Sequence, residues 1–240
     1  MSNESIRSAL APSGKLRATI NVGNPILAGL DKRTGEPYGV SVDIARELAT
    51  RLNTDLELIV VDAAAKAVET VTGGGADVGF FAIDPVRGAG IAFTSPYVLI
   101  EGCYLVRDDS AIKDNSQVDA PGIRVAAGAG SAYDLFLTRE LKRATIVRVP
   151  TSPAVVDAFV EQSLEVAAGV KQQLQADAAR HSGLRLIDQP FMVIRQAMGV
   201  AKGRGDAIAP YLRAFVDELR ASGFVREALT RHRIEGATPG

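Results

Sequence analysis

A run of apolar residues ends abruptly in side chains that could bind a charged ligand. Residues 78–83 read VGFFAI, and Asp84, Pro85 and Arg87 follow at once. An arginine guanidinium offers a planar fork of donors that suits a carboxylate. The alternative is that Arg87 pairs with Asp84 and lies exposed on a loop. Spacing alone favours that alternative, because surface arginines are common.

A second candidate lies in the sequence GAGSAYDLFL, residues 128–137. Its glycine turn leads into Ser131 at the start of a predicted helix, where free backbone N–H groups and the helix dipole suit an anion. An ordinary helix-capping role for Ser131 is about equally compatible with the sequence. The run Gly73–Gly75 lacks the Lys-Ser/Thr of a phosphate-binding loop and precedes a strand, so it indicates the end of a helix.

Composition excludes several classes of function. The 240 residues carry 27 Lys+Arg against 28 Asp+Glu, with no basic stripe, which argues against nucleic acid or an anionic membrane as a partner. The single cysteine, Cys103, lies in an apolar stretch and is expected in the core. His181 and His232 lie far apart without further ligands at metal spacing. We therefore expect no metal and no cofactor.

The elements that must position these residues alternate between strand and helix. Apolar patterns predict strands over 16–22, 55–62, 78–83, 123–128, 145–149, 164–170, 184–187 and 192–203. Helices are predicted between them, including 40–53 with Ser41 as a cap, and one from Pro153 capped by Thr151 or Ser152. The charged stretch 107–122 separates two halves with the same order. This alternation predicts parallel sheets covered by helices, whose ligands lie at the carboxyl ends of the strands.

The order of several motifs resembles the bacterial extracellular solute-binding proteins of family 3, which include amino-acid receptors of ABC importers. Matching positions run from Gly39 to Ala45, Gly74 to Asp77, Asp84 to Arg87 and Phe93 to Tyr97, followed by GAGSAYDLFL. The resemblance covers approximately residues 15–230. It implies an α/β, periplasmic-binding-protein-like fold with two lobes, each a mostly parallel sheet flanked by helices, joined by two crossover strands. Lobe 1 would comprise residues 1–105 and 197–240, and lobe 2 residues 106–196.

The resemblance also implies a ligand site in the cleft between the lobes. Arg87 matches the family's carboxylate-binding arginine, and Ser131 matches the hydroxyl residue at the glycine turn of the second lobe. The other expected ligand-binding residues are Asn24, Ile26, Phe81, Ala82, Asp84, Gly130, Ala132 and Val170.

Departures from the family pattern concern the partners of an amino group. Val170 stands where the family has an aspartate that pairs with the ligand ammonium, and Ala82 stands where it has Ser or Thr. Asp84 replaces the motif threonine and could supply the missing charge, since an unpaired buried ammonium is costly. The residues leave open whether the ligand is an α-amino acid or a plain carboxylate, and they favour something other than an ordinary amino acid.

The resemblance implies a non-enzymatic receptor for a small carboxylate-bearing metabolite, monomeric and serving an ABC permease. One alternative is a cytoplasmic ligand sensor, since the chain shows no apolar segment of signal-peptide length, whereas the family is periplasmic. The other is an enzyme of the cyclohexadienyl or arogenate dehydratase type, with Glu101 and Glu165 as candidate acids. A carboxyl group serves as an acid when burial raises its pKa.

Overall fold

The computed structural model describes residues 3–240, without the side chains of residues 3 and 205–207. The chain forms two compact units, unit 1 (Met1–Leu99 and Arg195–Gly240) and unit 2 (Ile100–Ile194). Both boundaries fall inside strands, the first in β6 (Ile91–Arg107) and the second in β11 (Met192–Ala201). The sequence-based boundaries at 105/106 and 196/197 stay a prediction.

Unit 1 is built on parallel strands. β1 pairs with β4 in parallel, from Lys15↔Asp55 to Asn21↔Val61, and a parallel bridge joins Ala18 to Val78 next to β5. β11 runs antiparallel to β5, with Gln196 opposite Ala82. Besides its parts of β6 and β11, unit 1 contains these elements: α1 (Asn3–Leu10), β1 (Lys15–Asn21), β2 (Gly29–Leu30), β3 (Pro37–Tyr38), α2 (Val40–Arg51), β4 (Asp55–Val61), α3 (Ala64–Thr72), β5 (Gly79–Ala82), the 3-10 helix η1 (Arg87–Ala89), α7 (Lys202–Ala221), α8 (Phe224–Arg231) and β12 (Thr238–Pro239).

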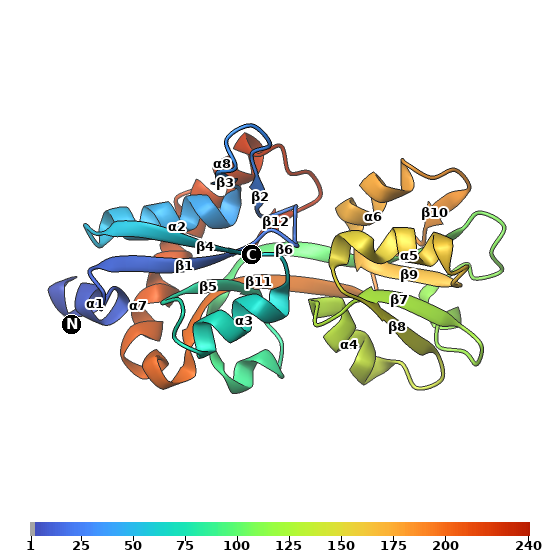
Figure 1. Ribbon diagram of the computed structural model, residues 1–240, viewed down its shortest axis with the longest axis horizontal. Helices are drawn as coiled ribbons and strands as arrows, with labels where there is room; N and C mark the ends of the chain where they lie inside the picture. Colours follow the sequence, from blue (N-terminus) through green and yellow to red (C-terminus); the bar gives the residue numbers. More distant parts are fainter. Residues whose placement is uncertain (1–2) are drawn as a thin grey trace. The chain divides into compact units, whose positions relative to one another are not determined.

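Helices cover both faces of the unit 1 strands. Figure 1 shows α2 on one side of β1 and β4 and α3 on the other. The helix α2 buries Val42, Ala45 and Leu48, the stripe that the sequence predicted. Ser41 is not its cap: Gly39 is the N-cap residue, and the Ser41 hydroxyl shares a 3.1 Å hydrogen bond with the hydroxyl of Tyr97. The helix α3 ends at Gly73, as the glycine run predicted.

An ion-pair cluster joins the strands of unit 1 to α7. Asp77 is fully buried just before β5, and its carboxylate accepts from the backbone N–H and guanidinium of Arg17 in β1 at 2.9–3.0 Å. It also accepts from Arg204 in α7 at 3.0 Å. Asp77, the aspartate of the Gly74–Asp77 motif, therefore links the amino ends of β1 and β5 to helix α7.

Unit 2 repeats the parallel arrangement. β7 pairs in parallel with β8 and with β9, and β6 runs antiparallel to β9 with Gly102 opposite Val170. Its elements are the 3-10 helix η2 (Asn115–Gln117), β7 (Arg124–Gly128), α4 (Ala132–Glu140), β8 (Thr145–Val149), the 3-10 helix η3 (Ser152–Ala154), α5 (Val155–Glu161), β9 (Val166–Val170), α6 (Lys171–Ala178) and β10 (Leu184–Leu186).

The core of unit 2 lies between α5 and its strands. Val155, Val156 and Phe159 of α5 pack against Ala126, Ala167 and Leu105. The predicted capping of this helix by Thr151 or Ser152 is wrong. A 3-10 turn precedes the α-helix, Ala154 becomes the N-cap, and neither side chain makes a capping hydrogen bond.

Candidate functional site

Two charged residues that follow the carboxyl end of β5, Asp84 and Arg87, are buried in unit 1. All four residues of β5 are buried, and Phe81 packs edge-on against Phe93 at 6.3 Å between ring centroids. Beyond Ala82, Asp84 is only 4% exposed and Arg87 only 6%. The exposed position that spacing favoured for Arg87 is therefore wrong.

A local turn explains why Arg87 is buried. The Asp84 side chain accepts from the backbone N–H of Val86 at 2.8 Å, and the Asp84 carbonyl accepts from Gly88 at 2.9 Å. Such aspartate turns reverse the chain within a few residues. The reversal brings Arg87 back to the strand, where its Nη1 donates to the Ala82 carbonyl at 3.2 Å.

Electrostatics keep Arg87 charged despite its burial. Loss of water lowers the pKa of Arg87 to about 10, and the nearby Asp84 carboxylate opposes this shift. At neutral pH the guanidinium is therefore a buried cation whose charge is offset by a buried acid of the same turn.

The turn after β1 lies at the same edge of unit 1. The Thr19 N–H donates to the Val78 carbonyl at 3.0 Å, so β1 and β5 run side by side towards Asn24 and Asp84. Asn24 Oδ1 is a buried acceptor without a hydrogen-bond partner among the described residues, and Ile26 beside it is half-buried. Unit 1 thus brings together six of the predicted residues: Asn24, Ile26, Phe81, Ala82, Asp84 and Arg87.

The glycine turn of unit 2 is held by two reciprocal hydrogen bonds. Ser131 is the N-cap of α4, and its Oγ accepts from the Asp134 N–H at 3.1 Å. The Asp134 carboxylate accepts in turn from the N–H of Gly130 at 2.8 Å, with Gly130 at a φ of 66°. The capping role of Ser131 is confirmed, and the residue is 6% exposed. Ala132 follows as the first residue of α4.

The hydroxyls of Tyr133 and Ser152, which were not among the predicted ligand-binding residues, lie beside this turn. Tyr133 donates its hydroxyl proton to Ser152 Oγ at 2.8 Å, and both groups press against Gly128. A Cβ on Gly128 would meet each oxygen at 2.9 Å. The sequence signal for Ser152 was its position three residues after the end of β8, whereas nothing in the sequence indicated Tyr133.

The carboxyl end of β9 carries an ion pair. Val170 ends the strand, and Lys171 Nζ lies 2.7 Å from Glu101 Oε2. This contact raises the pKa of Lys171. Because β7 and β9 are parallel neighbours, unit 2 brings Gly130, Ser131, Ala132 and Val170 to one edge.

The two candidate catalytic acids do not have the environment of an acid catalyst. Glu165 accepts from the guanidinium and N–H of Arg124 at 2.8–2.9 Å, and these contacts lower its pKa. Glu101 is neutralised by Lys171. A raised pKa, which acid catalysis would need, is absent at Glu165.

The described residues, 3–240, offer no metal site and no reactive thiol. Among these described residues no group of three or more His, Cys, Asp or Glu could hold a metal ion. Cys103 is buried, and burial raises its pKa to about 11. No helix that the structure describes has the length and apolarity needed to span a membrane.

Comparisons with known proteins agree on one fold. Residues 22–233 match the family of bacterial extracellular solute-binding proteins, family 3. No curated protein matches the chain. Among solved structures, a solute receptor for L-cysteine of Neisseria gonorrhoeae is 20% identical, covers 96% of this chain and 94% of its own, and has a TM-score of 0.81.

Two further structures extend the comparison. An amino acid ABC transporter substrate-binding protein from Streptococcus pneumoniae bound to L-arginine is 16% identical, with coverage of 94% and 97% and a TM-score of 0.79. A histidine kinase sensor domain with similarity to periplasmic binding proteins is 18% identical, with coverage of 94% and 98% and a TM-score of 0.78. The α/β periplasmic-binding-protein-like fold predicted from the sequence is confirmed.

Proposed function

Since the chain belongs to the bacterial extracellular solute-binding proteins of family 3, we propose that it captures a small carboxylate-bearing metabolite for an ABC importer. The ligand class is an amino acid or a related organic acid. Similar structures are a receptor for L-cysteine and a protein bound to L-arginine, which supports this class. Delivery to a permease, action as a monomer and the periplasmic location expected of the family belong to the same proposal.

The single observation that carries the proposal is the buried cation at the end of β5. Arg87 is 6% exposed and is held towards the strand end by its bond to the Ala82 carbonyl. A guanidinium held in this way is suited to the planar, two-point binding of a carboxylate. Ser131 at the α4 turn is the second proposed contact, because a helix amino terminus favours an anion.

Binding is proposed in preference to catalysis. Glu101 and Glu165 are both held in ion pairs, and Arg124 lowers the pKa of Glu165. Neither is poised to donate a proton. Turnover of prephenate or arogenate by the purified protein would contradict this part of the proposal.

A ligand sensor is the second candidate, because one similar structure is the sensor domain of a histidine kinase. Importer and sensor functions require the same ligand site. Co-purification of a permease with the tagged protein would favour the importer.

The decisive experiment is a thermal-shift screen of wild type and Arg87→Ala. The ligands are the twenty L-amino acids and their 2-hydroxy and 2-oxo analogues. A ligand at a hundred times its Kd stabilises by about 2.7 kcal/mol, or roughly 5–10 °C in Tm for a chain of this size. We expect at least one such shift in wild type and none in Arg87→Ala.

Each protein is compared with its own unliganded state, because Arg87→Ala also leaves Asp84 buried without its cation and lowers the starting Tm. Arg185→Ala is the matched control. Arg185 donates to the carbonyls of Ser110 and Ile112, away from the strand ends that form the proposed site. An undiminished shift in Arg87→Ala would remove Arg87 from the site.

A further inference from the structure

The strand β4 is paired on one side only. Its single partner is β1, in a register that runs without a bulge. The Val61 carbonyl accepts from the Val22 N–H at 2.9 Å and therefore faces β1. Because the N–H and C=O groups of successive residues point to opposite sides of a strand, those of Leu56, Leu58 and Val60 face away from β1. No residue that the structure describes bonds these outward groups.

The composition of β4 does not protect this open side. Proteins usually shorten or bulge an exposed edge strand, or place lysine or proline in it, because an open row of N–H and C=O groups can pair with another chain. The seven residues of β4 include no proline, lysine or glycine, and the two charges, Asp55 and Glu57, lie in its first half. None of the seven is buried, and Val60 is 40% exposed. The strand therefore has the length and composition to accept an added strand.

A polar cavity lies where β4 begins. Its volume is about 680 Å³, which is in the range of ligand sites, and its lining comes from α1 and from the turns that precede β1 and β4. The Thr54 hydroxyl donates to the Gly14 carbonyl at 3.0 Å and joins these two turns. Most of the lining side chains are polar, including those of Arg7, Ser8 and Asn53.

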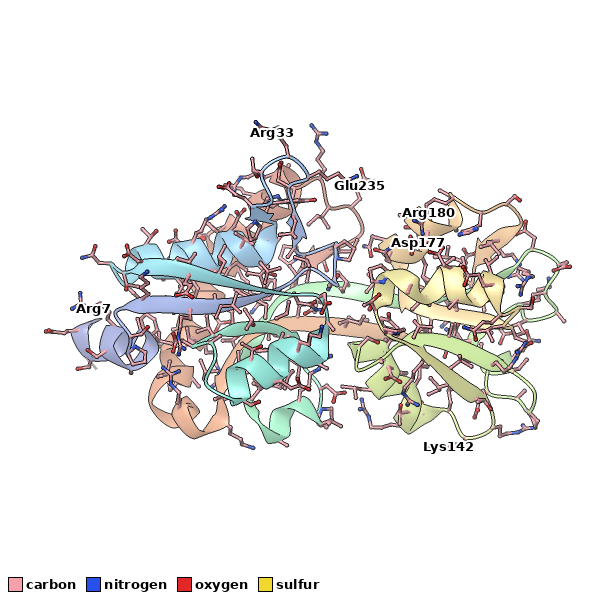
Figure 2. The ribbon with its side chains drawn as sticks, in the orientation of Figure 1. Arg7, Arg33, Lys142, Asp177, Arg180 and Glu235 are labelled. Carbon is pink, nitrogen blue, oxygen red and sulfur yellow. The ribbon has the colours of Figure 1, made fainter. Side chains whose placement is uncertain are left out.

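Arg7 gives the cavity a cation. It belongs to the last turn of α1, a helix that the buried Ile6 and Leu10 hold against α7. Figure 2 shows Arg7 at the end of unit 1 where β1 and β4 begin. No residue that the structure describes pairs with its guanidinium. Asp55, the acid of the lining, lies opposite Lys15 in the pairing of β4 with β1, and this lysine offsets its charge.

The open side of β4 and the cavity together define the direction of an added strand. A strand antiparallel to β4 passes Val61 first and ends beside Asp55, at the cavity. Its terminal carboxylate then lies near Arg7, whereas a parallel strand would bring an ammonium group there. The guanidinium favours the carboxylate, and antiparallel pairs are also slightly more stable per residue.

We propose that β4 and this cavity form a second binding site, which takes an extended peptide segment ending in a free carboxylate. The segment adds to β4 as an antiparallel strand, bonds the outward groups of Leu56, Leu58 and Val60, and places its carboxyl terminus on Arg7. Main-chain hydrogen bonds supply the affinity in this mode of recognition, and capture of the terminus fixes the register. The site shares no residue with the proposed solute site and does not depend on it.

The test is fluorescence anisotropy with a fluorescein-labelled peptide, TVTVV, that carries either a free carboxyl terminus or a terminal amide. Threonine and valine favour the strand conformation. Wild type should bind the free acid about tenfold more tightly than the amide, the effect of one charge-assisted contact. Arg7→Ala should bind the two peptides equally. Arg33→Ala is the matched control: it removes an exposed arginine from the turn between β2 and β3, and it should keep the tenfold preference.

Val60→Pro tests the addition of a strand. Proline removes the outward N–H of Val60, which the pairing with β1 does not use, and edge strands tolerate proline at such positions. Val60→Thr keeps this N–H and is the matched control. Both peptides should lose binding to Val60→Pro and retain it with Val60→Thr. In wild type, bound peptide should slow hydrogen exchange, followed by NMR, at the amides of Leu56, Leu58 and Val60.

Several results would overturn the proposal. They are equal binding of acid and amide by wild type, no binding of either at millimolar concentration, and exchange at the β4 amides that bound peptide does not slow. Self-association of wild type with these amides protected in the absence of peptide would also overturn it, and would make this edge an interface between copies of the chain. The exchange measurement on wild type decides the matter if Val60→Pro does not fold. The thermal-shift screen for solutes is read separately, so the proposed function stands or falls independently.

Discussion

Replacing Asp77 with asparagine should strongly destabilise unit 1. The carboxylate is fully buried and receives four donors: the N–H, Nε and Nη2 of Arg17 and the Nη1 of Arg204, all at 2.9–3.0 Å. Asparagine keeps the shape but turns one acceptor into a donor that faces a guanidinium. It also leaves two arginines without their acid. Breaking a buried ion pair in this way costs about 3–5 kcal/mol.

The expected loss is measurable by thermal unfolding. A change of 1 kcal/mol shifts Tm by roughly 2–4 °C for a chain of this size, so Asp77→Asn should lower Tm by about 6–20 °C at pH 7. Asp62→Asn is the control, because its ion pair with Lys66 is exposed on both sides, and we expect its Tm to match wild type. A Tm for Asp77→Asn within 2 °C of wild type would refute the reasoning.

The pH dependence has a definite sign. Hydrogen bonds and ion pairs with Arg17 and Arg204 lower the pKa of Asp77 in spite of its burial. A folded pKa below the unfolded value of about 3.9 means that the contribution is complete above pH 4–5 and is lost as pH falls through the folded pKa. The gap in Tm between wild type and Asp77→Asn should therefore narrow below about pH 4. A gap that stays constant from pH 7 to pH 3 would contradict an ionised Asp77.

Two further substitutions test the edge of unit 2. Gly128→Ala should lower Tm, because its Cβ would meet Ser152 Oγ and Tyr133 OH at 2.9 Å, and overpacking costs about 1–3 kcal/mol. Gly203→Ala is its control, since nothing lies within 4 Å of that Cβ in α7, and it should not lower Tm. Ser131→Ala should cost about 1 kcal/mol, or roughly 2–4 °C in Tm, through the lost cap of α4. Ser131→Asn should retain most of that stability, and a Tm for Ser131→Ala equal to wild type would show that the cap contributes nothing.

Local patterns in the sequence were sufficient to predict most elements and the edge at which the candidate residues gather. The spacing of apolar residues along the chain reflects which side chains are buried in a strand or a helix. For this reason the observed ranges of α2, β5 and β7 lie close to the predicted ones. The ends of helices were less predictable. Ser41 has the residue type of a cap, but its hydroxyl bonds Tyr97, which is 56 residues away in the chain.

What the sequence could not supply were partners distant in the chain. Asp77 stands out as a motif residue, but nothing local indicates that Arg17 and Arg204, at separations of 60 and 127 residues, share its carboxylate. Likewise the pairing of β12 with Val98 and Leu99 of β6 depends on where the chain returns after α8. Spacing alone did not predict the burial of Arg87, whereas the family resemblance placed it in the ligand site. An aspartate turn of four residues decides the burial, and apolar periodicity does not detect such turns.

The candidate edges of the two units use the same local device. At each, a side-chain oxygen accepts from a backbone N–H two to four residues away: Asn21 to Gly23, Asp84 to Val86, Ser131 to Asp134, and Asp134 to Gly130. These bonds fix the turns before any ligand arrives, and less ordering entropy is then lost on binding. Two of these side chains, Asp84 and Ser131, are also among the residues expected to contact the ligand. A fall in affinity after substitution of Asp84 or Ser131 therefore reports a lost contact only where the Tm of the unliganded variant shows that its turn has survived.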